Sequence, residues 1–123
     1  MKLEDLERID KKCMYKTYDD WPNIASESYN RKYKKIDVSD IDHIVFAGMG
    51  GSGSIGDTIS AILSKENIHV TIVKGYLLPK TVNENTLVVC TSISGNTDET
   101  LTVLQNSKKS DAKFVGLSSG GLV

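Results

Sequence analysis

The segment GMGGSGSIGD (48–57) could bind a phosphate group, because it combines closely spaced glycines with hydroxyl side chains. Its spacing Gly48-x-Gly50-x-x-Gly53 is that of the turn that binds the pyrophosphate of a dinucleotide. In such a turn the glycines let the backbone approach the phosphate, and the helix that follows directs N–H groups at it. The hydroxyl of Ser52 offers one more donor. The segment alone fits either a dinucleotide or a single phosphate.

A dinucleotide site needs a second feature, an acidic residue about 20 positions further on, at the end of the next strand. That strand ends in TIVKGYLLPK (71–80), which contains no acidic residue, and Asp57 and Glu66 come too early. Lys74 could instead pair with the extra phosphate of NADP, a minor alternative. The sequence therefore favours a smaller phosphate ester and predicts no cofactor.

A second segment, TSISGNTDET (91–100), presents three hydroxyls within six residues, those of Ser92, Ser94 and Thr97. Gly95 allows a tight turn there. Helix capping explains part of the pattern, since Asn96 and Glu99 have the spacing of a capping box. One helix needs only one capping hydroxyl, however. The start of a helix carries unpaired N–H groups and partial positive charge, so the other hydroxyls suit a phosphate without any lysine or arginine.

Both segments must follow strands and open helices to bind an anion in this way, and the sequence predicts both. Apolar runs predict buried strands at residues 41–48, 68–75, 86–94 and 113–121. Helical spacing of apolar residues predicts helices at 54–67 and 97–109, and the link 76–85 could hold a brief one. This alternation predicts an α/β fold with a doubly wound parallel sheet and right-handed crossovers.

The strand order decides whether the two segments meet. In the 2-1-3-4 order of a flavodoxin-like sheet, the first and third strands are neighbours, and their carboxyl ends form one crevice. We therefore predict that both segments surround one phosphomonoester. The candidate binding residues are Gly50, Gly51, Ser52, Gly53, Ser92, Ser94, Gly95, Asn96 and Thr97.

Residues 1–40 are predicted to form an N-terminal helical arm, and residues 41–123 the binding domain. In the arm, Leu3, Leu6 and Ile9 make one apolar stripe, and a second helix runs over 23–35 with Pro22 in its first turn. The arm is rich in basic residues, but acidic residues are interleaved with them. A solvated helix pair is therefore favoured over a partner-binding surface.

Composition excludes several classes of function. The 15 basic and 16 acidic residues give a net charge of −1, which argues against a nucleic-acid partner. Cys13 and Cys90 fit no metal spacing, so we predict no metal; Cys90 is expected to be a small buried residue. No apolar run reaches the roughly 20 residues that span a bilayer, and the N-terminus is no signal peptide. We expect a cytoplasmic protein with no membrane partner.

Together GMGGSGSIGD, TSISGNTDET and GLSSGG (116–121) resemble the N-terminal sugar isomerase (SIS) domain of bifunctional phosphoglucose/phosphomannose isomerases. The resemblance implies an enzyme of carbohydrate metabolism that interconverts glucose 6-phosphate or mannose 6-phosphate with fructose 6-phosphate. It implies two SIS domains per chain and a dimer. By motif, the residues that would bind the sugar phosphate are Ser52, Ser92, Ser94 and Thr97, with the Gly50–Gly51 backbone approaching the substrate.

The resemblance also implies that the catalytic glutamate, histidine, lysine and arginine lie beyond Val123, so we expect a truncated, inactive, substrate-binding half with no catalytic residue in this chain. His43 and His69 are expected at the strand ends opposite the crevice. The bare strand edge left by the short chain predicts an oligomer. The alternatives are a non-catalytic SIS module that senses a phosphosugar and, third, a nucleotide-binding α/β domain.

Overall fold

The computed structural model describes residues 3–33, 35–36 and 38–123. The chain divides into two compact units, Met1–Ile36 and Asp37–Val123, which we describe separately. Among the residues described, no helix is both long and apolar enough to cross a membrane.

The first unit consists of three short helices, α1 (Leu3–Ile9), α2 (Met14–Asp19) and α3 (Trp21–Asn30), and none of them has a buried residue. Helix α2 was not predicted, since six residues are too few to show a helical stripe. Cys13 lies in the turn before it, with φ of 53°, rather than in a helix. Pro22 stands in the first turn of α3, as predicted.

Helix α3 ends at Asn30, so its predicted extension to residue 35 is wrong. Arg31 is extended, with φ of −69° and ψ of 130°. The reason is the charge of the segment that follows, where four basic residues occupy positions 31–35 and would repel one another on a helix. One of the four, Lys34, lies outside the described residues.

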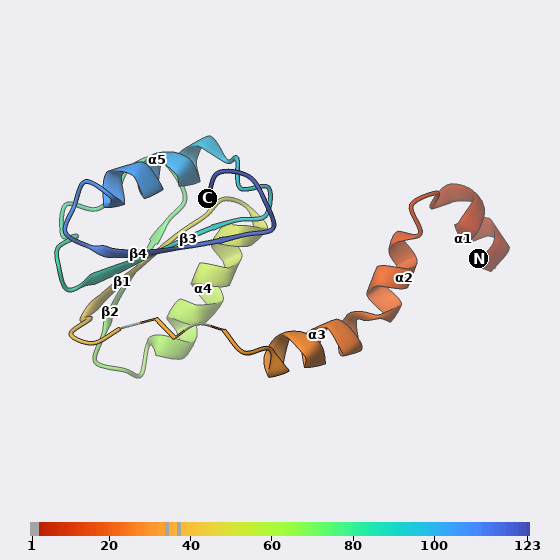
Figure 1. Ribbon diagram of the computed structural model, residues 1–123, viewed down its shortest axis with the longest axis horizontal. Helices are drawn as coiled ribbons and strands as arrows, with labels where there is room; N and C mark the ends of the chain where they lie inside the picture. The colour runs from red at the N-terminus through yellow and green to blue at the C-terminus, as the bar shows by residue number, and fades with distance from the viewer. Residues whose placement is uncertain (1–2, 34, 37) are drawn as a thin grey trace. The chain divides into compact units, whose positions relative to one another are not determined.

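The second unit is a parallel four-stranded sheet in the order β2-β1-β3-β4, which confirms the doubly wound α/β prediction and its strand order. The strands are β1 (His43–Ala47), β2 (His69–Val73), β3 (Thr86–Ser92) and β4 (Lys113–Ser118). Helix α4 (Gly51–Leu63) packs on β1 and β2, and α5 (Asp98–Ser107) packs on β3 and β4 from the other face (Figure 1).

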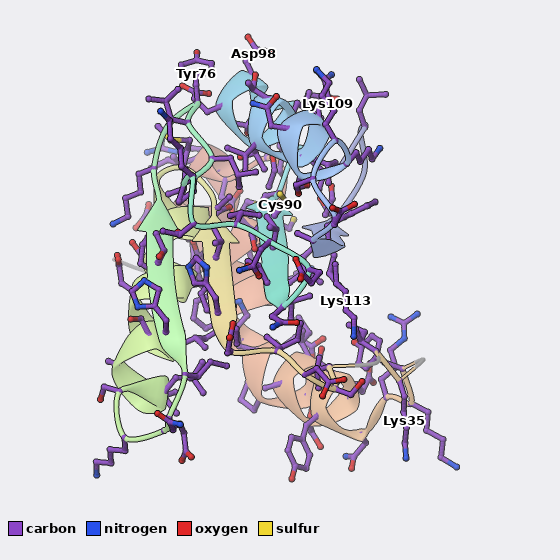
Figure 2. All side chains as sticks on the ribbon, turned by 90° about the vertical axis from the view of Figure 1, so that its left-hand side faces the viewer. Lys35, Tyr76, Cys90, Asp98, Lys109 and Lys113 are labelled. Carbon is purple, nitrogen blue, oxygen red and sulfur yellow. The ribbon has the colours of Figure 1, made fainter. Side chains whose placement is uncertain are left out.

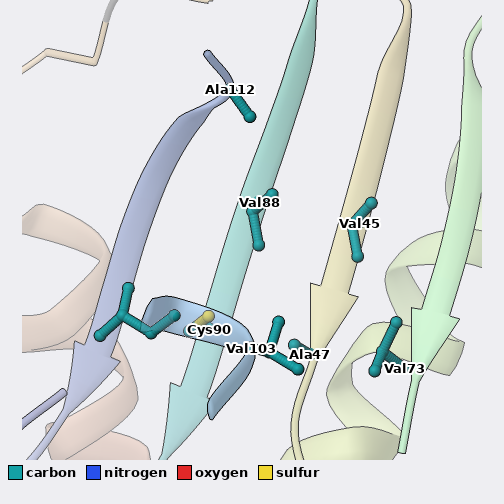
Figure 3. Packing of buried hydrophobic residues seen from close by; sticks show 8 residues of the cluster. Val45, Ala47, Val73, Val88, Cys90, Val103 and Ala112 are labelled. Carbon is teal, nitrogen blue, oxygen red and sulfur yellow. The ribbon is translucent and has the colours of Figure 1, made fainter. Parts of the chain in front are cut away.

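The apolar core lies between the sheet and α5. Val45, Val88 and Cys90 of the two central strands are fully buried, and Val103 of α5 packs into the same cluster (Figure 3). Burial raises the pKa of the Cys90 thiol to about 11, so Cys90 is a small buried residue, as predicted.

Helix α4 contacts its face of the sheet through glycines. Gly53 and Gly56 are its buried residues, whereas Ile55 and Ile62 are 48% and 68% exposed. A Cβ atom on Gly56 would lie 2.8 Å from the Cβ of Phe46. The helix therefore approaches the sheet at a distance that only glycine allows.

The link between β2 and β3, residues 74–85, crosses the sheet through turns and contains no helix. Leu78 and Val82 of this link pack against the core instead. The brief helix that the sequence allowed here is therefore absent. Two apolar side chains on turns cover this part of the core in its place. At the other side β4 forms an edge, where Leu117 is 51% exposed.

Candidate phosphate-binding site

The turn between β1 and α4 packs closely against the end of β3. A Cβ atom on Gly48 would lie 2.9 Å from the backbone oxygen of Thr91 and 3.1 Å from the Cβ of Ser52. Gly50 is the N-cap of α4, with φ of 55° and ψ of −129°, a conformation that favours glycine. The two predicted segments therefore lie side by side at the carboxyl edge of the sheet.

The other glycines of this turn have different roles. A Cβ atom on Gly53 would lie 2.7 Å from the backbone oxygen of Gly48 and 3.1 Å from the Cε of Lys74, so Gly53 packs tightly. Gly51 has no atom within 4 Å of its Cβ position, and both Gly50 and Gly51 are exposed. Their backbone is accessible to a ligand, while Ser52 is half-buried beside them.

The turn between β3 and α5 is organised by its own hydroxyls. Ser92 Oγ accepts the N–H of Gly95 at 3.1 Å and lies 2.8 Å from Thr97 Oγ1. Ser94 Oγ accepts the N–H of Asn96 at 3.2 Å and lies 3.5 Å from Ser92 Oγ. Gly95 has φ of 69°, which turns the chain between them. The structure thus brings the three predicted hydroxyls together.

Together these hydroxyls keep one proton that they can donate. Ser92 and Thr97 share one hydrogen bond, which uses one of their two protons. The contact of Ser94 with Ser92 uses a second proton, so one of the three O–H groups is left for an acceptor, and Ser94 is the exposed hydroxyl of the three. A group with several acceptor oxygens and a negative charge, such as a phosphate, matches this arrangement.

The helix starts at this edge have no side-chain caps. The N-cap of α5 is Thr97, whose hydroxyl contacts Ser92 and makes no cap hydrogen bond, and the N-cap of α4 is Gly50. The predicted capping box of Asn96 and Glu99 is therefore wrong, because α5 begins one residue later, with Thr97 rather than Asn96 as its N-cap. In α4 the N–H groups of Ser52 and Gly53 both donate to the Met49 backbone oxygen, at 3.1 and 3.4 Å. The start of α5 is therefore the one of the two that offers its first N–H groups to an anion.

Lys74 is held by an ion pair rather than left for a cofactor phosphate. Its Nζ lies 2.7 Å from Asp57 Oδ2, and each side chain is 48% exposed. Asp57 lies in the second turn of α4. Beyond the end of β2 at Val73 there is a lysine and no acidic residue, as the sequence indicated.

The sequence reasoning missed Tyr76, which lies at this edge. Tyr76 lies near the carboxylate of Glu99 in the first turn of α5, and the negative charge of Glu99 raises the pKa of Tyr76. Figure 2 shows Tyr76 and Asp98 at the same end of the unit. No sequence spacing pointed to this contact, because 23 positions separate the two residues.

At the opposite edge, His43 and His69 start β1 and β2 and face each other in register, with ring centroids 4.7 Å apart. This confirms their predicted location away from the crevice. His43 is 5% exposed, and its Nε2 lies 2.9 Å from Thr71 Oγ1. Burial lowers the pKa of His43, and the neighbouring His69 lowers it further. A cleft of about 540 Å³ opens beside the pair.

A metal site is not formed by the described part of the chain, which contains no group of three histidine, cysteine or acidic side chains arranged to hold an ion. Cys13 and Cys90 are both free. The chemistry of the carboxyl edge is therefore that of neutral donors: backbone N–H groups and hydroxyls.

The model of the SIS domain matches residues 37–121. The chain belongs to the SIS domain family. Relatives named bifunctional phosphoglucose/phosphomannose isomerase include one from Caldicellulosiruptor bescii, 39% identical over 87 residues, or 70% of this chain and 26% of the relative. Another, from Aeropyrum pernix, is 32% identical over 110 residues, or 85% of this chain and 33% of the relative. This SIS chain spans about a quarter to a third of the length of such relatives.

Solved structures share the fold of this SIS unit. A candidate phosphosugar isomerase from Clostridium difficile 630 superposes with a TM-score of 0.59 at 20% identity, covering 87% of this chain and 30% of the other. One from Bacillus subtilis gives a TM-score of 0.57 at 24% identity, covering 65% and 26%. The family resemblance and the fold that the sequence predicted are therefore confirmed.

Proposed function

We propose that this chain is the sugar-phosphate-binding half of an aldose–ketose isomerase that interconverts glucose 6-phosphate or mannose 6-phosphate with fructose 6-phosphate. One observation carries the proposal: the hydroxyls of Ser92, Ser94 and Thr97 cluster at the uncapped start of α5, beside the glycine turn that precedes α4. The names of the similar relatives support the choice of substrate.

In this proposal the phosphate binds between the two turns. The exposed backbone of Gly50 and Gly51, the hydroxyl of Ser52 and the turn at Gly53 contribute from one side. The residues that contribute from the other side are Ser92, Ser94, Gly95, Asn96 and Thr97. Hydrogen bonds to a charged group contribute roughly 1.5–3 kcal/mol each, so three or four of them support micromolar to millimolar binding after the costs of association.

We propose that the catalytic base is not supplied by these residues. An isomerase base must lie within hydrogen-bond reach of the proton that it removes. The carboxylates at this edge have other neighbours or positions: Asp57 pairs with Lys74, and Glu99 lies near Tyr76 in the first turn of α5. This chain covers 26% of the Caldicellulosiruptor bescii relative, which supports a base in further chain. As the family resemblance implies, the proposal places this base in a second SIS domain of an enzyme that works as a dimer. The domains in this proposal are an arm, 1–40, and the SIS domain, 41–123.

The test is calorimetric titration with fructose 6-phosphate, glucose 6-phosphate, fructose and NADP, together with an isomerase assay of the same sample. We expect both sugar phosphates to bind, fructose not to bind, and no turnover. Ser94→Ala should weaken binding by about tenfold. Ser54→Ala is the matched control, since that hydroxyl only approaches the Gly50 oxygen on the exposed side of α4, at 3.4 Å.

Binding of NADP without binding of fructose 6-phosphate would overturn the proposal in favour of a nucleotide site. Turnover of glucose 6-phosphate by this chain would contradict the assignment of the base to other residues. Binding without turnover agrees with both the isomerase half and the phosphosugar-sensing alternative. To separate them, this chain is fused to the remaining part of the Caldicellulosiruptor bescii relative: turnover would support the isomerase half, and its absence in a folded fusion would favour the sensing module.

A further inference from the structure

The segment that follows β4, residues 119–123, crosses the serine turn, and we call it the strap. The N–H of Ser119 donates to the backbone oxygen of Ile93 at 3.3 Å. The N–H groups of Leu122 and Val123 both donate to the backbone oxygen of Gly95, at 2.9 and 3.2 Å. The strap is therefore bonded to the backbone on both sides of Ser94.

Two glycines with positive φ meet at this crossing. Gly95 has φ of 69° and Gly121 has φ of 79°. A Cβ atom on Gly121 would overlap the backbone oxygen of Ser94 and lie 2.8 Å from Asn96 Oδ1. A Cβ atom on Gly95 would overlap the backbone oxygen of Gly120. The contact is backbone against backbone, so no side chain can move aside to relieve a larger residue.

The hydroxyls of this region are used within the protein. Ser118 Oγ accepts the N–H of Gly120 at 3.0 Å and donates to the backbone oxygen of the same residue. Ser119 Oγ donates to the backbone oxygen of Ile93. The Ser94 hydroxyl, in contrast, is exposed and bonds within its own turn, to Ser92 Oγ and the Asn96 N–H. Although GLSSGG contains two hydroxyls, its geometry is that of a support for the neighbouring turn.

The far end of the strap is anchored in the sheet. Val123 is half-buried against the core cluster, and its Cγ1 lies 3.1 Å from where a Cβ on Gly116 of β4 would stand. The strap thus connects the serine turn to β4 and the core. A displacement at Gly121 would be transmitted to Ser94 and Asn96, since both touch it directly.

We propose that Gly121 is a positioning residue for phosphate binding: by close backbone contact it fixes the turn that carries the Ser94 hydroxyl. This inference rests on the proposed function, because it names what holds the proposed phosphate site in shape. A side chain at position 121 would push the Ser94 carbonyl away and reorient the donors without removing any of them.

The test compares Gly121→Ala with Gly120→Ala, which is matched because the Cβ position of Gly120 has no atom within 4 Å. Calorimetric titration with fructose 6-phosphate is run well below the melting temperature of each variant. We expect Gly120→Ala to bind within about twofold of the wild type, and Gly121→Ala to bind at least about tenfold more weakly.

A double-mutant cycle separates positioning from general damage. If Gly121 acts through Ser94, then Ser94→Ala should cost about tenfold in the wild type and less than about threefold in the Gly121→Ala background. Additive effects would overturn the inference. Should Gly121→Ala fail to fold, Ser119→Ala removes one bond of the strap, and its cycle with Ser94→Ala should show the same loss of additivity.

The two proposals fail in different ways. A wild-type chain that does not bind fructose 6-phosphate overturns the proposed function and this inference with it. A wild-type chain that binds, with a folded Gly121→Ala variant that binds equally well, overturns only the inference.

Discussion

The polar groups at the amino and carboxyl ends of the strands differ in how far their hydrogen bonds are satisfied within the protein. At the amino edge, His43 is buried and bonds Thr71, and Thr86 bonds Asn83. At the carboxyl edge, Ser94 is the exposed member of three hydroxyls that leave one proton to donate, and neither helix that starts there has a side-chain cap. One edge satisfies its polar groups internally, and the other leaves donors for a ligand.

This difference shows why the presence of a cleft does not by itself identify the site. The cleft of about 540 Å³ lies at the amino edge, beside side chains that already bond one another. A ligand gains most where donors are preorganised and unused, since each new bond then costs little rearrangement. The hydroxyl turn meets that condition, and four predictions test the contrast.

The largest effect is expected at the carboxyl edge, from Gly48→Ala. The new Cβ would lie 2.9 Å from the Thr91 backbone oxygen, and neither strand can shift without disturbing the sheet. We expect a loss of about 1–3 kcal/mol in the free energy of unfolding, measured by urea denaturation. Gly51→Ala is the control, because its Cβ position is empty, and it should change stability by less than about 0.5 kcal/mol. Equal effects would contradict the close contact of the two turns.

The second prediction separates two serines of one turn. Ser92 is buried, and Ser92→Ala leaves the Gly95 N–H without that partner, so we expect a loss of about 1–2 kcal/mol of stability. Ser94 is exposed, and Ser94→Ala should cost less than about 0.5 kcal/mol while weakening fructose 6-phosphate binding. The measurements are urea denaturation and calorimetry. Equal stability losses in the two variants would argue against their different roles.

The third prediction concerns pH and the amino edge. The pKa of His43 is lowered in the folded chain, so below its ordinary value of about 6.5 the unfolded chain binds this proton first. The contribution to stability is therefore complete above about pH 6.5 and is lost as the pH falls toward the folded-state pKa. His69, Asp42 and the Thr81 backbone face this ring and modulate the effect. His43→Gln should flatten the pH dependence of unfolding between about pH 5 and 7; an unchanged profile would rule His43 out as its source.

The smallest effect is expected from Lys74→Ala. The ion pair with Asp57 is about half exposed on both sides, so its loss should cost about 0.2–1 kcal/mol, with the cost shrinking in salt. Lys80→Ala, an exposed lysine on the following link, is the control. Strong NADP binding that disappears in Lys74→Ala would contradict the assignment of Lys74 to an ion pair. It would instead support the alternative hypothesis of a dinucleotide site.

Much of the fold was predictable because its signals are local. Apolar runs such as TLVVCTS marked the strands, and glycines with hydroxyls marked the two turns at their ends. The order of strands and helices then followed from their alternation. Two local features were missed. Helix α2 is too short to show a helical period, and α3 ends at Asn30, where a run of basic residues follows.

By itself, the sequence determined which residues the candidate site contains, since glycine, serine and threonine at those spacings recur within single turns. Only the tertiary structure decided how they are held. The Gly48–Thr91 contact, the pairing of Lys74 with Asp57 and the contact of Gly121 with Ser94 each join segments far apart in the chain. Such contacts depend on strand order and on backbone distances of a few tenths of an ångström, which no residue type or spacing encodes locally.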